Sequence, residues 1–128
     1  MRISRTVEYG FIAAVFIAQN RKDGRVIART ISKAHGISTE YLQQVLQHLA
    51  KYGILTSLRG PKGGFDLAKP ATEITLLDII EAIDGSVQAS TGLTGEATKK
   101  AEKIFIDVSK TAKVSLAKVT IADVAGKK

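Results

Sequence analysis

The 128-residue sequence contains no cysteine and no tryptophan, and it has only two histidines and two prolines. Without cysteine the chain can form no disulfide, no thiolate metal site and no cysteine nucleophile. The two histidines, His35 and His48, are too few for a histidine-rich metal site. We therefore expect a protein without a metal centre, and the absence of cysteine by itself does not indicate a compartment.

Acidic residues are scarce in the first half of the chain. The whole sequence has 19 Lys and Arg against 12 Asp and Glu, a formal net charge of +7. Residues 1–70 hold 11 basic and 4 acidic residues, whereas residues 71–128 hold 8 of each. All the excess positive charge thus lies in residues 1–70, which favours a polyanionic partner such as nucleic acid or an anionic membrane surface.

Long hydrophobic runs are also missing. The longest apolar segment, Gly10–Ala18, is far shorter than the roughly 20 residues of a membrane-spanning helix. Two arginines precede it, as in a secretory signal peptide, but Glu8 interrupts the approach and no small-x-small cleavage site follows. Apolar residues recur there at helical spacing, so we expect a core-facing helix capped by Ser4 or Thr6.

The most informative stretch runs from Ile37 to Leu67. Ser38 is a good N-cap residue, and Gly53 can take the left-handed conformation that ends a helix. Apolar residues between them recur at i, i+3, i+4 and i+7, which predicts one buried helical face. The predicted buried face is Leu42, Val45, Leu46 and Leu49, and the exposed face is Thr39, Gln43, Gln44, Gln47 and Lys51.

A hairpin is predicted directly after this helix. Thr56–Arg59 is typical of a short strand, and Gly60–Gly63 fits a turn with Pro61 at its second position. Phe65–Leu67 alternates apolar and polar residues, as a returning strand does. Arg59 and Lys62 could contact phosphates there, because the glycines beside Pro61 allow the backbone to approach closely.

A second helix is predicted before the central one. Arg25–Ala34 has an apolar stripe of Ile27 or Ala28, Ile31 and Ala34, but no good N-cap residue. The turn His35–Gly36 separates it from Ser38, which gives a helix-turn-helix. An amide-rich face can enter the DNA major groove, where Gln suits a bidentate contact with adenine. The alternative is a helix and hairpin of another small α+β domain, with solvated glutamines.

The segment after the hairpin contains one more short helix. Thr75 is the expected cap of a helix from Leu76 to Ile83, and Gly85 ends it. Asp78 and Glu81 could in principle act as an acid–base pair. They lie on a predicted exposed face with no nucleophile nearby, so we expect no catalytic residue and no enzyme activity. The predicted buried stripe is Leu76, Ile79, Ile80 and Ile83.

The C-terminal third begins with a polar linker, residues 86–95, followed by a helix from Glu96 to about Thr111. An apolar stripe on this helix needs a partner, which is either the same helix of a second subunit or the chain's own domain. We favour dimerisation. The predicted dimerisation residues are Ala101, Ile104, Phe105, Val108 and Ala112. This divides the chain into a winged helix-turn-helix domain (1–85), a linker (86–95) and a dimerisation helix with a C-terminal element (96–128).

The sequence resembles the bacterial winged-helix transcription regulators typified by IscR, NsrR and CymR. The resemblance covers about the first 85 residues, and Thr120–Val124 resembles the end of family members. The motif Arg-Gly-Pro-x-Gly-Gly followed by an aromatic residue is quite specific for this family when it comes after such a helix. The segments that carry the resemblance are Met1–Ser4 with Tyr9, His35–Ser38, Tyr41–Leu42, Gly53–Leu55, Arg59–Phe65, and the segment from Glu73–Leu76 through Asp84–Gly85.

The resemblance implies a fold that is mainly α with a small β-hairpin wing, in a cytoplasmic homodimer that binds a palindromic operator, usually as a repressor. The implied partners are double-stranded DNA and a second copy of the chain, without a membrane. Gln43 stands where members of this family often have Glu, so we expect the preferred bases to differ from theirs. The implied DNA-binding residues are Thr39, Glu40, Tyr41, Gln43, Gln44, Arg59, Pro61, Lys62 and Gly63.

One departure from the family concerns its signal. Cluster-binding members carry three cysteines before the long helix, and the corresponding region here, Ser86–Glu96, has none and is shorter. An iron–sulfur cofactor held by those thiolates is therefore not expected. The remaining effectors are a small molecule, a partner protein or none. A winged-helix module that binds proteins rather than DNA is the alternative function.

Overall fold

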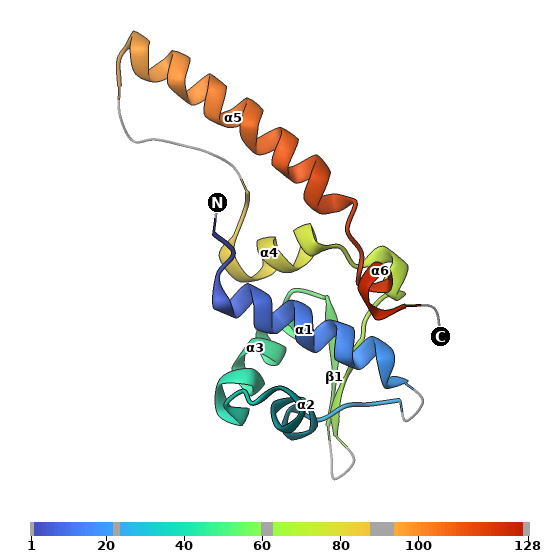
Figure 1. Ribbon diagram of the computed structural model, residues 1–128. Coiled ribbons are helices and arrows are strands. Elements are labelled where there is room, and N and C mark those ends of the chain that lie inside the picture. The colour runs from blue at the N-terminus through green and yellow to red at the C-terminus, as the bar shows by residue number, and fades with distance from the viewer. Residues whose placement is uncertain (1, 22–23, 60–62, 88–93, 127–128) are drawn as a thin grey trace.

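The computed structural model describes residues 2–21, 24–59, 63–87 and 94–126. Its helices form a domain beneath one long projecting helix, and a two-stranded hairpin extends from the opposite side of the domain (Figure 1). The elements, in chain order, are α1 (Arg5–Gln19), α2 (Ala28–His35), α3 (Thr39–Lys51), β1 (Leu55–Leu58), β2 (Gly64–Leu67), the 3-10 turn η2 (Ala71–Glu73), α4 (Leu76–Asp84), α5 (Glu96–Ala117) and α6 (Ile121–Ala125).

Helix α1 is the centre of the core and contacts α3, α4 and α6. Ser4 caps it by accepting a hydrogen bond from the Val7 amide at 3.2 Å. A side chain at Gly10 would meet Ile83 of α4 at 2.8 Å, so glycine allows the two helices to pack closely. The predicted core-facing N-terminal helix is confirmed. Its buried residues are Val7, Gly10, Ala13, Ala14 and Ile17.

The hairpin pairs β1 and β2 in antiparallel register, with Leu55 opposite Leu67 and Leu58 opposite Gly64. Phe65 also forms an isolated bridge with Val26, whose amide donates to the Phe65 carbonyl at 2.9 Å. The segment before α2 thus attaches the hairpin to the helical domain. The second helix begins at Ala28, not at the predicted Arg25, because Val26 is extended in this bridge.

The inner stripe of α2 differs from the prediction in its outer members. Ala28 and Ile31 are buried, but Ile27 and Ala34 are exposed. Ile27 stands at the N-cap position and makes no side-chain cap hydrogen bond, so the predicted poor capping is confirmed. Most of the predicted turn at residues 60–63 lies outside the described residues, and only Gly63 is described.

Helix α4 starts as predicted, with a capping box between Thr75 and Asp78. Thr120 and Asp123 repeat the same capping box at the start of α6. The two caps are neighbours, because Thr75 and Thr120 form a β-bridge and the Ile121 amide donates to the Ile74 carbonyl at 2.9 Å. The C-terminal element is therefore packed into the core beside α1.

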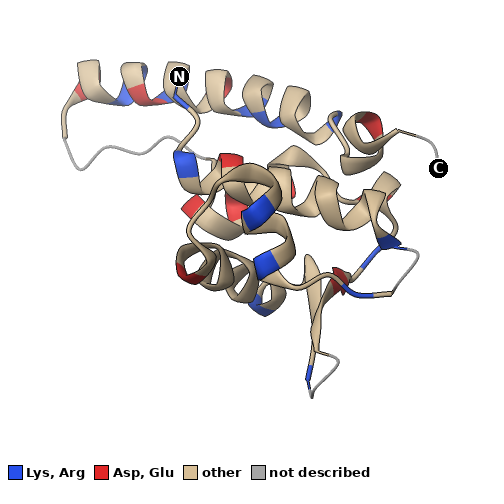
Figure 2. Cartoon of the chain, turned by 60° about the horizontal axis from the view of Figure 1, so that its bottom comes forward, with Lys and Arg blue, Asp and Glu red and all other residues tan. Residues whose placement is uncertain are grey.

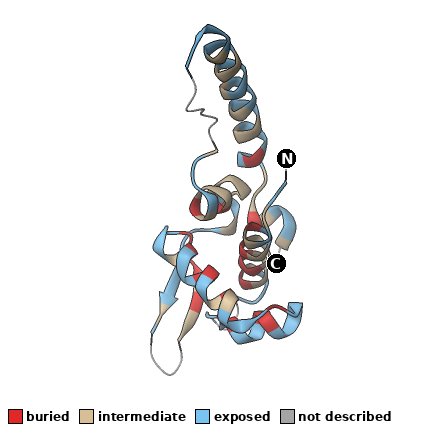
Figure 3. Cartoon of the chain, turned by 90° about the vertical axis from the view of Figure 1, so that its left-hand side faces the viewer, coloured by how far each residue is buried: buried red, intermediate tan, exposed pale blue. Residues whose placement is uncertain are grey.

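Helix α5 projects away from the domain and is mostly exposed (Figure 3). It extends to Ala117, six residues beyond the predicted end near Thr111. Leu116 is its one buried residue, and Lys113 lies 3.8 Å from the Glu81 carboxylate of α4. Residues 88–93 of the predicted linker lie outside the described residues. None of the helices within the described ranges is long and apolar enough to cross a membrane.

Candidate nucleic-acid interface

Helices α2 and α3 are joined by a tight turn at Gly36. This glycine takes a left-handed conformation with φ 64°, and its amide donates to the Ser32 carbonyl. The Ile37 amide donates to the same carbonyl at 3.2 Å, and the Ile37 side chain is buried. The turn residue and the buried anchor fix the angle between the helices, so the predicted helix-turn-helix is confirmed.

The N-terminal turn of α3 is held by hydroxyl groups. The Ser38 side chain accepts from the Tyr41 amide at 3.3 Å, which confirms the predicted cap. The Thr39 hydroxyl lies 2.6 Å from the Ser32 hydroxyl of α2, so its hydrogen bonding is partly used within the protein. Glu40 is exposed at the positive end of the helix dipole. Side-chain hydrogen bonds therefore hold the first turn of α3, while Glu40 in this turn stays exposed to solvent.

The two predicted base-reading glutamines occupy different surroundings. Gln43 is half-buried and lines a groove of about 300 Å³ between α3 and the hairpin, together with Ser57, Gly63 and Gly64. Gln44 is exposed and lies beside Tyr41 on the side of α3 that faces α1 and α4. The structure therefore brings Gln43, but not Gln44, next to the wing.

Tyr41 is directed toward the protein rather than toward the wing. Its hydroxyl forms a hydrogen bond with the Thr6 hydroxyl of α1. Its ring lies edge-on to Tyr9, with centroids 5.5 Å apart. Tyr41 therefore joins the N-terminal part of α1 to the N-terminal part of α3. Its use of the hydroxyl in this contact was not foreseen from the sequence.

The described part of the wing contains two predicted DNA-binding residues. Arg59 is exposed directly after β1, and Gly63 is half-buried before β2. Pro61 and Lys62 lie outside the described residues. Gly64 has φ 147°, and a side chain there would meet the Val26 carbonyl oxygen at 3.0 Å. Glycine at this position therefore lets the wing pack directly against the segment before α2.

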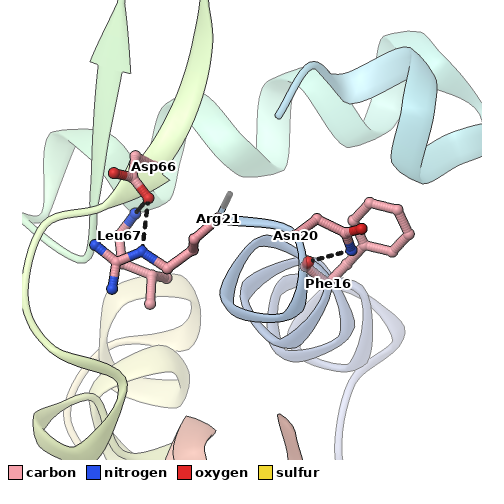
Figure 4. A network of polar contacts seen from close by, with 5 residues as sticks. All are labelled: Phe16, Asn20, Arg21, Asp66 and Leu67. Carbon is pink, nitrogen blue, oxygen red and sulfur yellow. Dashed lines mark hydrogen bonds and ion pairs between the residues drawn. The ribbon is translucent and has the colours of Figure 1, made fainter. Parts of the chain in front are cut away.

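The base of the wing is also held by an ion pair. The Arg21 Nε atom lies 3.2 Å from the Asp66 carboxylate, which also accepts from the Leu67 amide at 2.8 Å (Figure 4). Asn20 closes the end of α1 next to it through a 2.8 Å bond to the Phe16 carbonyl. Asp66 thus positions the hairpin relative to α1, a role that the alternating strand pattern did not indicate.

Basic residues also occur outside α3 and the wing. Figure 2 shows Lys and Arg positions on several helices of the domain and along α5. Arg25 and Arg29 are exposed at the start of α2, and Lys33 is exposed near its end. The sequence predicts phosphate contacts only for Arg59 and Lys62. The charge excess of residues 1–70 was the signal that could have drawn attention to α2 as well.

His48 and the two carboxylates considered as an acid–base pair, Asp78 and Glu81, have structural partners. His48 Nε2 lies 2.6 Å from the Ala82 carbonyl oxygen. Since a carbonyl only accepts, this nitrogen donates the hydrogen bond. Asp78 belongs to the capping box of α4, and Glu81 pairs with Lys113. No cluster of three or more His, Asp or Glu suited to a metal ion occurs within the described ranges.

The predicted dimerisation stripe lies on α5. Ile104, Phe105 and Val108 are 61%, 47% and 63% exposed, whereas Ala101 and Ala112 are half-buried. The large apolar residues of the stripe are thus uncovered in the single chain. Val114, which is 57% exposed, is not part of this stripe. It lies about 120° around the helix from Val108, at 100° per residue.

Comparison with known proteins agrees with this architecture. The chain matches the Rrf2 family, described as an iron-dependent transcriptional regulator, over residues 3–127. It is 39% identical over 90 residues to the HTH-type transcriptional regulator IscR of Photorhabdus laumondii. That match covers 70% of this chain and 55% of the relative, so the chain spans about half the length of the curated relatives it matches.

Solved structures give the same result over nearly the whole chain. The structure of CymR (YrzC), the global cysteine regulator of B. subtilis, superposes with a TM-score of 0.82 at 28% identity. It covers 98% of this chain and 96% of CymR. T. potens IscR gives a TM-score of 0.74 at 30% identity, over 97% and 85% of the two chains. The predicted winged-helix fold and the predicted resemblance are confirmed.

The family description raises the question of iron. An iron–sulfur cluster is ordinarily held by cysteine thiolates, and the sequence has no cysteine at all. His48 is engaged by the Ala82 carbonyl, and His35 is exposed with its ring packed edge-on against Phe16. The residues present do not fit a thiolate-ligated cluster.

Proposed function

Because this chain belongs to the Rrf2 family of transcriptional regulators, we propose that it is a cytoplasmic, sequence-specific DNA-binding regulator that occupies a palindromic operator as a homodimer. The observation that carries the proposal is the groove between α3 and the hairpin. It places Gln43 beside the wing, and Arg59 is exposed on that same wing. A base-reading amide and a phosphate-binding cation are thus presented by neighbouring elements.

The contacts with DNA divide into two kinds. The N-terminal half of α3 enters the major groove, where Gln43 and Gln44 read base edges. Arg59, Arg25 before α2 and Arg29 on α2 contact phosphates on either side, which sets position and affinity without reading sequence. Tyr41 keeps α3 in place through Thr6 and acts as a positioning residue.

The homodimer joins two such readers. One winged helix contacts only a short half-site, so a second copy is needed for a tight and specific complex. The uncovered stripe of Ile104, Phe105 and Val108 is the surface that we assign to the twofold contact. Two copies related in this way bind half-sites about 34–36 Å apart, or a multiple of that distance. We propose repression, because an occupied operator blocks other proteins from the same DNA.

A protein-binding winged helix is the second candidate function. Exposed apolar residues on α5 support it, because they could bind another protein instead of a second copy. The charge distribution favours DNA, since a docking domain does not require a net charge of +7 within residues 1–70.

Selection of bound fragments from sheared genomic DNA tests the proposal. The full chain should enrich fragments that share an inverted repeat, and Gln43→Ala should weaken binding to the selected site by about 1–3 kcal/mol with little loss on random DNA. Gln47→Ala is the matched control, because it removes an exposed amide further from the N-terminal turn of α3. Enrichment of no common sequence, or equal losses for both variants on both DNAs, would favour the protein-binding alternative.

A further inference from the structure

A cavity of about 200 Å³ lies at the foot of α5, where this helix meets the N-terminal segment and the end of α4. Its apolar lining includes Ile3 and Val7 of the N-terminal part of the chain, Ile80 of α4 and Leu116 of α5. Arg2 and Asp84 stand at the same cavity with opposite charges. The site therefore combines an apolar interior with one cation and one anion, and it lies outside the DNA-binding surface described above.

The two charges are available to a ligand. Within the described part of the chain, neither Arg2 nor Asp84 takes part in an ion pair, with each other or with another residue. Asp84 Oδ2 accepts a long hydrogen bond of 3.4 Å from the Ser4 hydroxyl. The neighbouring carboxylates on α4 differ, since Asp78 completes a capping box and Glu81 pairs with Lys113. Asp84 is thus the carboxylate of α4 that remains for an external cation.

The size of the cavity limits the ligand. It is smaller than the roughly 300–1,000 Å³ of sites for drug-sized molecules, so it suits a small metabolite. Arg2 and Asp84 are both exposed at this cavity, so a ligand with a single charge could pair with only one of them. A molecule with a carboxylate, an ammonium group and a short aliphatic side chain matches all three parts of the site.

We propose that this cavity is an effector site for a free aliphatic amino acid. The ligand carboxylate binds the Arg2 guanidinium, its ammonium group binds Asp84, and its side chain packs between Ile80 and Leu116. The effector role rests on the proposed DNA-binding function, whereas the ligand site itself is testable without DNA.

The walls of the cavity connect the site to both working parts of the protein. Leu116 belongs to α5, which carries the proposed dimerisation stripe. The N-terminal segment continues into Thr6, which holds Tyr41 of the recognition helix. A ligand that fills the space between them fixes α5 relative to α3. Because pre-organised half-site readers lose less freedom on binding, we expect the bound amino acid to tighten operator binding.

Calorimetric titration of the full chain with L-leucine tests the ligand site. Leucine should bind. Two analogues, 4-methylpentanoate, which lacks the ammonium group, and 3-methylbutylamine, which lacks the carboxylate, should each bind at least about tenfold more weakly than leucine. Arg2→Gln and Asp84→Asn should each weaken leucine binding about tenfold. Lys99→Gln and Glu73→Gln remove the same charges at exposed positions away from the cavity and should leave it unchanged.

The outcomes separate this proposal from the proposed function. No heat with leucine at millimolar concentration, or equal binding of 4-methylpentanoate, overturns the amino-acid site even if the protein binds DNA. Fluorescence anisotropy with a selected operator then tests the coupling, and an affinity that leucine does not increase overturns the effector role. Leucine binding that depends on Arg2 and Asp84 in a protein without DNA affinity would support the site and refute the DNA-binding function.

Discussion

Substitutions on α5 decide whether its exposed stripe joins two subunits. Val108→Glu places a carboxylate at the middle of the stripe, and Val114→Glu makes the same change six residues later on another face. The two valines are 63% and 57% exposed, so neither substitution disturbs the core of the single chain. The pair therefore separates an effect on dimerisation from an effect on folding.

The expected loss of dimer stability in Val108→Glu follows from the exposed area of Val108. Burying a whole Val side chain stabilises by roughly 1.5–3 kcal/mol, so covering the exposed part of Val108 is worth about 1 kcal/mol in each subunit. Glu at this position adds a desolvation penalty of at least about 1 kcal/mol per copy. Because a twofold interface contains each residue twice, the total is about 4 kcal/mol, or about a thousandfold in the dimer dissociation constant.

Sedimentation equilibrium across a dilution series measures that constant. The wild-type chain and Val114→Glu should dimerise alike, and Val108→Glu should be monomeric with an unchanged far-ultraviolet circular dichroism spectrum. Its affinity for a two-half-site operator should fall to that of a single half-site. If both variants dimerise equally, or if Val114→Glu is the one that dissociates, the stripe of Ile104, Phe105 and Val108 is not the subunit interface.

Three further substitutions test the candidate DNA-binding surface and the contacts that hold its parts in place. Arg59→Ala should reduce the salt dependence of binding to a two-half-site operator by about 1.8 log units per log unit of salt, about 0.9 for each subunit, while Lys69→Ala, at the other end of the hairpin, should not. Equal slopes would remove Arg59 from the phosphate contacts. Gly64→Ala should lower the unfolding free energy, measured by urea denaturation, by about 1 kcal/mol or more, because φ is 147° and the Val26 carbonyl oxygen lies 3.0 Å from the added carbon. An unchanged unfolding free energy would contradict the close packing of the wing against Val26. Tyr41→Phe should lower the unfolding free energy by about 1 kcal/mol, because the hydrogen bond to the Thr6 hydroxyl is lost. A loss of DNA-binding free energy larger than this loss of stability would show that the Tyr41 hydroxyl also contacts DNA.

Local sequence signals predicted most of the helices and their caps. Ser38 and Thr75 cap helices where the side-chain pattern indicated, and Gly85 and Gly53 follow helix ends with positive φ. These features depend on a few neighbouring residues, so they are visible in the sequence. The end of α5 was missed because Ala112 to Ala117 is a weakly periodic segment, which helix propensity and the burial of Leu116 extend to Ala117.

Contacts between distant segments could not be predicted in the same way. Val26 pairs with Phe65, and Arg21 pairs with Asp66, across about 40 residues of chain. Nothing in the local pattern of either partner identifies the other. The same holds for the separation of Gln43 from Gln44, since consecutive residues on a helix point about 100° apart and only the position of the wing decides which one lies beside it.

The placement of α6 changes how the long helix is expected to behave. Ile121 is fully buried, and α6 packs along α1 while its cap bridges to Thr75. Helix α5 is therefore followed by an element that belongs to the same core as the recognition helix. A rotation of α5 about its foot must strain that attachment, and Leu116 lies at the foot, at the cavity that Arg2 and Asp84 border. This geometry links the proposed dimer contact on α5 to the proposed recognition helix α3, so we expect a small ligand at that junction to bias both half-sites of the proposed dimer together.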